Sequence, residues 1–149
     1  MKIAVSGGRH YADAHSVKFA LNAAVMAMRK KIGSKESIVL IHGGATGADA
    51  LAHKWAEYWC RTRNEEVEIV ICEANWQAYG KAAGPARNST IAEGIPGWGK
   101  PDLWVFFPGG RGTADAYRKA IAAGIATMCV NISDPNSPYI PPPGEIIKP

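Results

Sequence analysis

The sequence predicts a single three-layer α/β domain, in which a central parallel sheet of about five strands is covered by helices on both faces. Three observations carry this prediction. Strand-like and helix-like segments alternate along the chain. Three of the strands run directly into a glycine-rich turn that opens a helix. The chain has 149 residues, 47% of them hydrophobic, which is enough for one full core and too little for two ordinary domains.

The first part of the chain contains two strand–turn–helix units. Residues 2–6 form a short strand that ends in Gly7-Gly8-Arg9, and the following apolar residues recur at helical spacing. The second strand leads into the turn HGGATG, which again precedes an amphipathic segment. The elements expected here are strands over residues 2–6 and 37–41 and helices over residues 13–31 and 48–63.

The second part of the chain continues the alternation with a longer loop. Residues 73–84 are expected to be loop, and Pro85 suits the first turn of a short helix. The strand LWVFF is apolar throughout, as in strands buried on both faces, and it leads into PGGRGT and a helix that begins near Thr113. The remaining expected elements are strands over residues 66–72, 103–107 and 126–132, a helix over residues 85–93 and a loop over residues 94–101.

Three glycine-rich turns are predicted to meet at one edge of the sheet. In an open parallel sheet, ligands bind beyond the carboxyl ends of the strands, where the strand order reverses. With the order 3-2-1-4-5, residues 6–9 and 108–113 flank that point, and residues 42–47 lie beside them. Glycines allow close backbone approach, and a helix N-terminus favours an anion, above all phosphate. Neither G-x-G-x-x-G nor G-x-x-x-x-G-K-[ST] is present with the right spacing.

Composition limits the remaining classes. The net charge of +4 permits contact with nucleic acid, but Lys and Arg are spread along the chain with no block of five like charges. Cys60, Cys72 and Cys129 are odd in number and far apart, which indicates reduced core thiols and a cytoplasmic protein. No signal peptide or membrane span is expected. Residues 1–132 form the predicted domain, and residues 133–149 form a proline-rich C-terminal tail.

Four stretches together resemble a known family. In chain order they are SGGRHY, HGGATGADALAHKWA, AGPARNSTIAE and PDLWVFFPGGRGTADAYRKA. They are similar to the SLOG superfamily, in particular its small single-domain members related to YspA. PGGRGT matches the PGGxGT phosphate-binding signature of LOG phosphoribohydrolases, and GGATGADALAH resembles the GGARGIDxxAH segment of DprA. The resemblance implies a Rossmann-like fold, binding of nucleotides or ADP-ribose-type molecules, and a homo-oligomer.

The predicted binding residues come from the three turns and their surroundings. Arg9 and Arg111 suit bidentate phosphate contact or a surface ion pair. Asp49 caps its helix or binds a sugar hydroxyl or a metal ion. Trp76 and Tyr79 sandwich a base, anchor a hydrophobic lid or form a dimer contact. The family resemblance adds Arg87 and Asn88. The full set is Ser6, Gly7, Gly8, Arg9, Gly43, Gly44, Ala45, Thr46, Asp49, Trp76, Arg87, Asn88, Pro108, Gly109, Gly110, Arg111, Gly112 and Thr113.

Three histidines near these turns have open roles. His42 and His10, at or near strand ends, touch ligand or orient a loop. His53 follows Asp49 by four residues and faces the same side of the helix. No metal and no cofactor are predicted.

The activity depends on one carboxylate. LOG enzymes carry PGGxGTxxE, and the resemblance implies that this glutamate acts on an N-glycosidic bond together with an arginine. In this chain Ala116 holds the glutamate position, and Asp115 precedes it with a helical rotation of ~100°. Asp115 and Arg87 are therefore the candidate catalytic residues.

Three functions follow in order of preference. The first is capture of a nucleotide or nucleotide-derived signal, by a sensor or sequestering protein. The second is a LOG-like hydrolase of nucleoside monophosphates. The third is a DprA-like binder of single-stranded DNA, against which the dispersed charge argues.

Overall fold

The protein is built around a five-stranded, all-parallel sheet. The computed structural model describes residues 1–33 and 35–132. Its strand order is β3-β2-β1-β4-β5, so the order reverses between β1 and β4. The predicted α/β class is confirmed, and the observed order is the one assumed in placing the glycine-rich turns. The strands are β1 (Lys2–Ser6), β2 (Ile38–His42), β3 (Val67–Ile71), β4 (Leu103–Phe106) and β5 (Thr127–Cys129).

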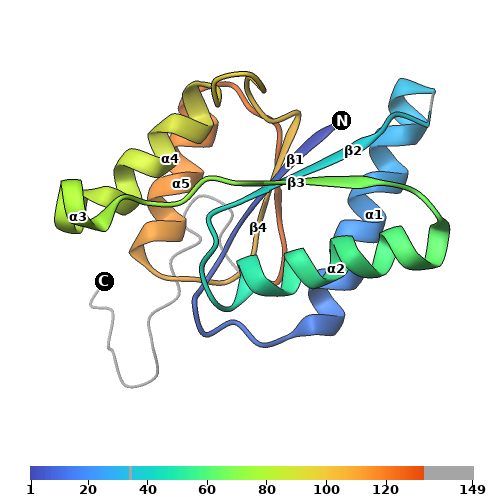
Figure 1. Cartoon of the computed structure of the whole chain (residues 1–149), viewed down its shortest axis with the longest axis horizontal. Coiled ribbons are helices and arrows are strands. Elements are labelled where there is room, and N and C mark those ends of the chain that lie inside the picture. Colours follow the sequence, from blue (N-terminus) through green and yellow to red (C-terminus); the bar gives the residue numbers. More distant parts are fainter. Residues whose placement is uncertain (34, 133–149) are drawn as a thin grey trace.

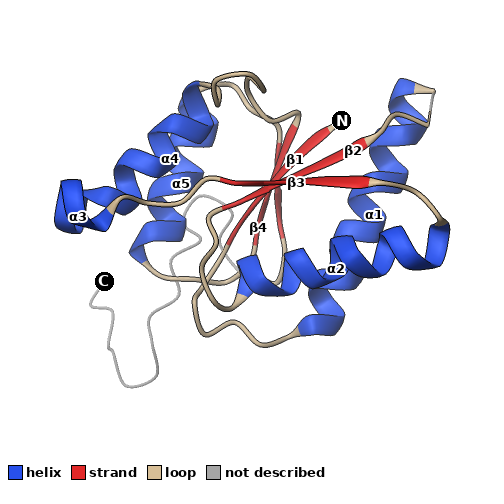
Figure 2. Ribbon diagram, in the orientation of Figure 1, coloured by secondary structure: helices blue, strands red, loops and turns tan. Residues whose placement is uncertain are grey.

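Helices cover both faces of this sheet. Figure 1 places α1 and α2 on one side and α3, α4 and α5 on the other, and Figure 2 shows the strands as a single central layer. The short α3 continues through a turn of 3₁₀ helix over Gly80–Ala82 into α4. The helices are α1 (Ala14–Ile32), α2 (Ala48–Arg63), α3 (Trp76–Tyr79), α4 (Ala83–Glu93) and α5 (Arg111–Ala122).

Central strands supply side chains to two hydrophobic cores. Val105 of β4 faces the core under α1 and α2, where Trp55 and Trp59 are also buried. Trp104 and Phe106 face the other core, under α4 and α5. Burying an aromatic or large aliphatic side chain stabilises a fold by about 1.5–3 kcal/mol. This pattern explains why residues 103–107 are continuously apolar instead of alternating.

Local signals in the sequence set the ends of α1 and α2. The Asp13 side chain accepts a hydrogen bond from the Ser16 amide and caps α1. Gly33 ends the same helix with φ 74°, and Asn64 ends α2 with φ 50°. Both are left-handed conformations in which Gly and Asn are favoured.

The structure corrects several expectations from the sequence. The stretch 73–84 contains α3, capped by the Asn75 side chain, and is not loop throughout. The final helix begins at Arg111, two residues before Thr113. Cys60 is exposed and not a core residue, although all three cysteines are free. The proline-rich segment 133–149 lies outside the described residues. In the part of the chain that is described, no helix is long and apolar enough to cross a membrane.

Gly47, in the turn after β2, packs closely against the turn after β1. Its φ is 73°, and a Cβ at this position would collide with the carbonyl oxygen of Gly8 and lie 2.6 Å from that of Arg9. We therefore expect Gly47→Ala to destabilise the protein by about 3 kcal/mol, because strain and overlap add. Gly84→Ala is the control, since its Cβ would meet only Trp76 at 3.6 Å within a helix; it should be neutral or stabilise by about 0.5–1 kcal/mol. Urea denaturation measures the free energy of unfolding of both variants, and equal values would contradict the close packing at Gly47.

Candidate functional site

Backbone hydrogen bonds hold the three glycine-rich turns together. The amide of Gly8 donates to the carbonyl of Pro108 at 2.9 Å, and the amide of Ala48 donates to the carbonyl of Gly8 at 3.1 Å. The hydroxyl of Thr46 donates to the carbonyl of Arg9 at 3.0 Å. The turns after β1, β2 and β4 therefore form one connected surface at the carboxyl edge of the sheet.

Close packing explains the glycines at these contacts. A Cβ on Gly7 would lie 2.5 Å from the Cβ of Ala48, and one on Gly109 would overlap the hydroxyl of Thr113. Larger residues would push the turns apart. A Cβ on Gly110 or Gly112, in contrast, would have no atom within 4 Å, so these two glycines leave space open at the surface of the turn.

A cleft of about 780 Å³ opens over this surface, at the point where the strand order reverses. Most of the predicted binding residues line it, and Gly44 and Thr46 instead line an adjoining lobe of about 400 Å³ with Glu73. The two spaces share Arg9, Gly43, Ala45, Trp76 and Arg87. The predicted residues in the main cleft are Ser6, Gly7, Gly8, Arg9, Gly43, Ala45, Asp49, Trp76, Arg87, Asn88, Pro108, Gly109, Gly110, Arg111, Gly112 and Thr113.

The N-terminus of α5 opens into the cleft. Gly110 is its N-cap, in extended backbone with φ −95°, and no side chain caps the helix. The amide of Ala114 makes the first bond of the helix, to the carbonyl of Gly110. The amides before it belong to the first turn, which leaves donors without helical partners and concentrates the positive end of the helix dipole. This end of the cleft favours an anion.

Basic side chains surround the same space. Arg9, Arg87 and Arg111 line it as predicted, and Lys81 and Arg118 line it as well. The guanidinium carbon of Arg9 lies 5.2 Å above the centre of the Trp76 ring, a cation–π contact on the edge of the cleft. Trp76 is half-exposed, so its ring is available to a ligand beside it.

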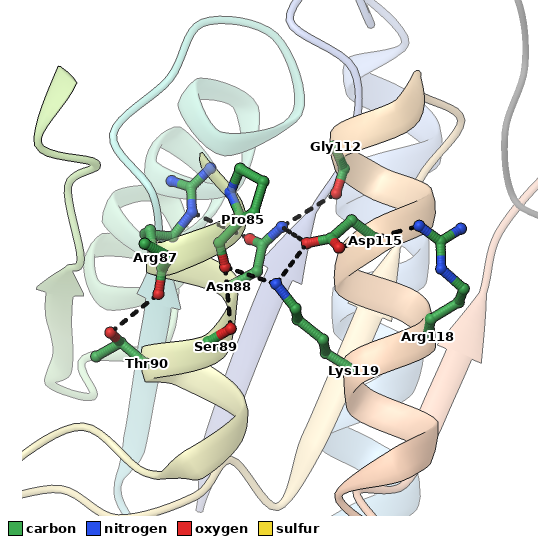
Figure 3. A network of polar contacts seen from close by, with 10 residues as sticks. Pro85, Arg87, Asn88, Ser89, Thr90, Gly112, Asp115, Arg118 and Lys119 are labelled. Atoms are coloured by element: carbon green, nitrogen blue, oxygen red, sulfur yellow. Dashed lines mark hydrogen bonds and ion pairs between the residues drawn. The ribbon is translucent and has the colours of Figure 1, made fainter. Parts of the chain in front are cut away.

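Asn88 connects α4 to the first turn of α5. Its amide nitrogen donates to the carbonyl of Gly112 and to Asp115 Oδ2, both at 3.1 Å. Its amide oxygen accepts from Arg87 Nε at 3.1 Å. Figure 3 shows Asn88 between these partners, with Lys119 reaching Asp115 from the next turn of α5. Asn88 is buried, and it acts as a brace for the arginine and the helix start.

Asp115 lies on the wall of the cleft but is already paired. Its Oδ2 is 3.0 Å from Lys119 Nζ, and its Oδ1 is 3.9 Å from Arg118. Ala116 is fully buried in the core with Phe106 and Tyr117. The carboxylate at the cleft is therefore one residue earlier than in PGGxGTxxE, and the glutamate position itself faces away from the ligand space.

Asp49 folds back onto the turn that precedes its helix. Its Oδ2 accepts hydrogen bonds from the amides of Gly43 at 3.1 Å and Ala45 at 3.3 Å. Burial raises the pKa of this carboxyl above its ordinary value, against these hydrogen bonds and the charges of Arg87 and Arg9. The structure thus gives Asp49 the role of holding the turn before α2, and no side chain caps that helix.

His42 supports the same turn from below. It is 2% exposed, and its Nδ1 accepts a hydrogen bond from the amide of Gly44 at 2.9 Å. Burial, followed by the nearby His53, lowers the pKa of His42 from 6.5 to about 4. His42 is thus neutral at physiological pH and orients the turn. His10, another of the three histidines with open roles, lines the main cleft.

The predicted residues differ in how their side chains are used. The Ser6 hydroxyl accepts from the Trp104 indole at 2.9 Å, so its contribution to the cleft is mainly backbone. The sequence did not single out Tyr11, Lys81 or Arg118. Arg118 follows Asp115 by three residues on α5, and that helical spacing could have identified it. Lys81 was missed because its segment was expected to be loop. In the described ranges, no three His, Cys, Asp or Glu side chains gather to hold a metal.

The parallel sheet and the joined glycine turns define a Rossmann-like protein, and its cleft lies at the switch point, where open parallel sheets usually bind ligands. The chain belongs to the YspA, cpYpsA-related SLOG family, whose model matches residues 1–79. Membership supports a nucleotide-related function in general. The chain is also 35% identical to the Gene 61 protein of Mycobacterium phage D29 over 97 residues, which cover 64% of this chain and 73% of that protein. The turn PGGRGT lies beyond the matched residues 1–79.

The Asn88 brace can be tested through stability. We expect Asn88→Ala to destabilise the protein by roughly 2 kcal/mol, because it leaves a buried space and removes the donors to Gly112 and Asp115. Thr90→Ala is the control, since it removes an exposed hydroxyl bonded only to the carbonyl of Ala86 in the same helix. Its change should stay within about 0.5 kcal/mol. Chemical denaturation compares the two, and an equal effect would exclude the brace.

Neutral His42 predicts a pH dependence of stability. Because its pKa is lower in the folded than in the unfolded chain, the unfolded chain takes up the proton first as pH falls. The stabilisation is complete above pH 6.5 and is lost between pH 6.5 and about 4, by roughly 3 kcal/mol in total. His42→Asn keeps an acceptor near Nδ1 but cannot titrate, so the difference between the two denaturation profiles should follow this window. Parallel profiles would refute the prediction.

Proposed function

We propose that this protein binds a nucleotide or nucleotide derivative, such as an ADP-ribose-type molecule, as a sensor or sequestering protein. The observation that carries the proposal is the uncapped start of α5 opening, beside Arg9 and Arg87, into a cleft of about 780 Å³. This volume falls within the range of about 300–1,000 Å³ common for small-molecule sites. Backbone donors and guanidinium groups together are suited to phosphate oxygens.

The arrangement of the ligand follows from the two ends of the cleft. The phosphate lies against the turn PGGRGT and the start of α5, and the base or sugar extends toward Trp76 and the adjoining lobe. Stacking on an aromatic ring is worth about 1–3 kcal/mol per base in nucleic-acid complexes. A nucleoside without phosphate is therefore expected to bind much more weakly than the corresponding nucleotide.

Binding without turnover is favoured by the state of the carboxylates. Glycosidic cleavage passes through an oxocarbenium-like state that a fixed carboxylate stabilises. Here Asp115 is paired with Lys119 and Asn88, and Ala116 lies in the core. Asp49 is committed to the amides of Gly43 and Ala45.

Calorimetry with adenosine, AMP, ADP and ADP-ribose tests the proposal, with Gly110→Val as the diagnostic variant. Valine fits the extended backbone at residue 110 and projects into open space, so the fold should persist while backbone approach is blocked. We expect at least a tenfold loss of affinity, or about 1.4 kcal/mol. Ala122→Val is the control, an exposed change at the far end of α5. Unchanged affinity in Gly110→Val would place the ligand elsewhere.

Chromatography of the same mixtures separates binding from hydrolysis. Release of free base that disappears in Asp115→Asn would overturn the proposal in favour of a phosphoribohydrolase. A third arm uses single-stranded oligonucleotides, for which affinity that rises with length and falls steeply with salt would indicate a nucleic-acid binder.

A further inference from the structure

Two histidines in edge-to-face contact lie directly behind the ligand-facing turn. His42 ends β2 and is buried, whereas His53 lies in α2 with its side chain 37% exposed. His42 Nε2 and His53 Nδ1 are 2.9 Å apart, and the planes of the two rings meet at 74°. Neither ring lines the main cleft or its adjoining lobe.

The neighbouring groups fix the direction of each hydrogen bond. An amide N–H can only donate, so the Gly44 amide requires a lone pair on His42 Nδ1. The proton of neutral His42 is therefore on Nε2, and it is donated to His53 Nδ1. His53 then carries its own proton on Nε2, 3.7 Å from Glu57 Oε1. A directional chain runs from the solvent edge of α2 to the backbone of the turn.

We propose that His42 and His53 are positioning residues that transmit protonation of the exposed ring to Gly44, so that the ligand-binding turn loosens when that ring takes up a proton. The statement about ligand rests on the proposed function. Imidazole is the side-chain group that most readily gains or loses a proton near neutral pH. Among the described residues, these two rings in hydrogen-bond contact connect the Gly44 amide to the exposed surface of α2.

The proton balance explains the effect. A proton added to His53 must go to Nδ1, the atom that accepts from His42 in the neutral pair. Either the two N–H groups then face each other, or the His42 proton moves from Nε2 to Nδ1 and faces the Gly44 amide. One proton is taken up in each case, and one hydrogen bond of the chain is lost. In the second case the lost bond is the one from the Gly44 amide, so the turn that carries Gly43 and Gly44 loses its support from β2.

Other charged groups also face this turn, and they must be separated from the histidines. Asp49 binds the amides of Gly43 and Ala45, and Arg87 NH1 donates to the carbonyl of Gly43 at 3.4 Å. Glu73 approaches Gly44 from the segment after β3, where the Cys72 amide donates to the carbonyl of His42. The groups in question are Asp49 and Glu57 on α2, Arg87 on α4, Cys72 and Glu73 after β3, and Arg9 after β1.

The primary test needs no ligand. NMR of the free protein between pH 8 and 5 should find His42 protonated on Nε2, and the Gly44 amide shift should titrate together with the His53 ring. The Gly44 titration should vanish in His53→Asn, which keeps Asp49, Glu57 and Glu73 in place. The control His15→Ala removes an exposed imidazole on α1 and should leave the titration unchanged. A flat Gly44 shift, or one that persists in His53→Asn, would overturn the proposal.

A second measurement tests whether the hydrogen bonds from Gly44 through His42 to His53 affect ligand binding. ADP-ribose is a suitable probe because each of its two phosphates has one ester and one anhydride bond, so neither has a second ionisation near pH 6 to confuse the result. Its affinity should fall about fivefold between pH 8 and 5, the worth of one hydrogen bond, and the fall should be absent in His53→Asn. If the Gly44 amide shift titrates and ADP-ribose does not bind at any pH, the proposed ligand is wrong, but the coupling of His53 to Gly44 stands. If ADP-ribose binds but the Gly44 amide shift does not titrate, the coupling of His53 to Gly44 is wrong and the proposed function stands.

Discussion

The hydrogen bond between the Gly8 amide and the Pro108 carbonyl is the contact on which the site depends. It joins the turns after β1 and β4, the two strands between which the chain reverses its direction of winding. A crevice is unavoidable at this point, because the helices on either side leave in opposite directions. The Gly8 carbonyl accepts from the Ala48 amide and adds the turn after β2. Gly8 therefore sets the distance between all three turns, and backbone contacts determine the shape of the cleft.

Some polar side chains at the cleft and behind it are held by hydrogen bonds within the protein and support its walls, whereas other groups are exposed to the cleft. Asp49 and His42 hold the turn after β2 from two sides. Asn88 ties α4 to α5. The start of α5 has no side-chain cap, and the Trp76 ring is half-exposed. A preorganised frame of this kind loses little entropy when a ligand enters, which favours affinity.

Much of the fold could be predicted from the sequence because its signals are local. Each strand is recognisable from its apolar run and the glycine turn that follows it, and the meeting of the turns was deduced by assuming the order 3-2-1-4-5, which the structure has. The turn of helix at Trp76–Tyr79 was missed because its only signal is the Asn75 cap before four residues. The Asn88 network could not be predicted, since its partners are 24 and 27 residues away and depend on how α4 packs against α5. The sequence likewise left the roles of Asp49 and His42 open, because the partner of each is a backbone amide.

The burial of Ala116 determines how α5 can face the cleft. A glutamate there would place its carboxylate against Phe106 and Tyr117 in the core, and burying an unpaired charge is far more costly than the fold can tolerate. Turning α5 by the ~100° that separates neighbouring residues would expose residue 116, but it would also withdraw Asp115 from Asn88. A single substitution therefore cannot interconvert this arrangement and one based on PGGxGTxxE. In this fold the packing of one methyl group therefore determines which residue of α5 faces the cleft.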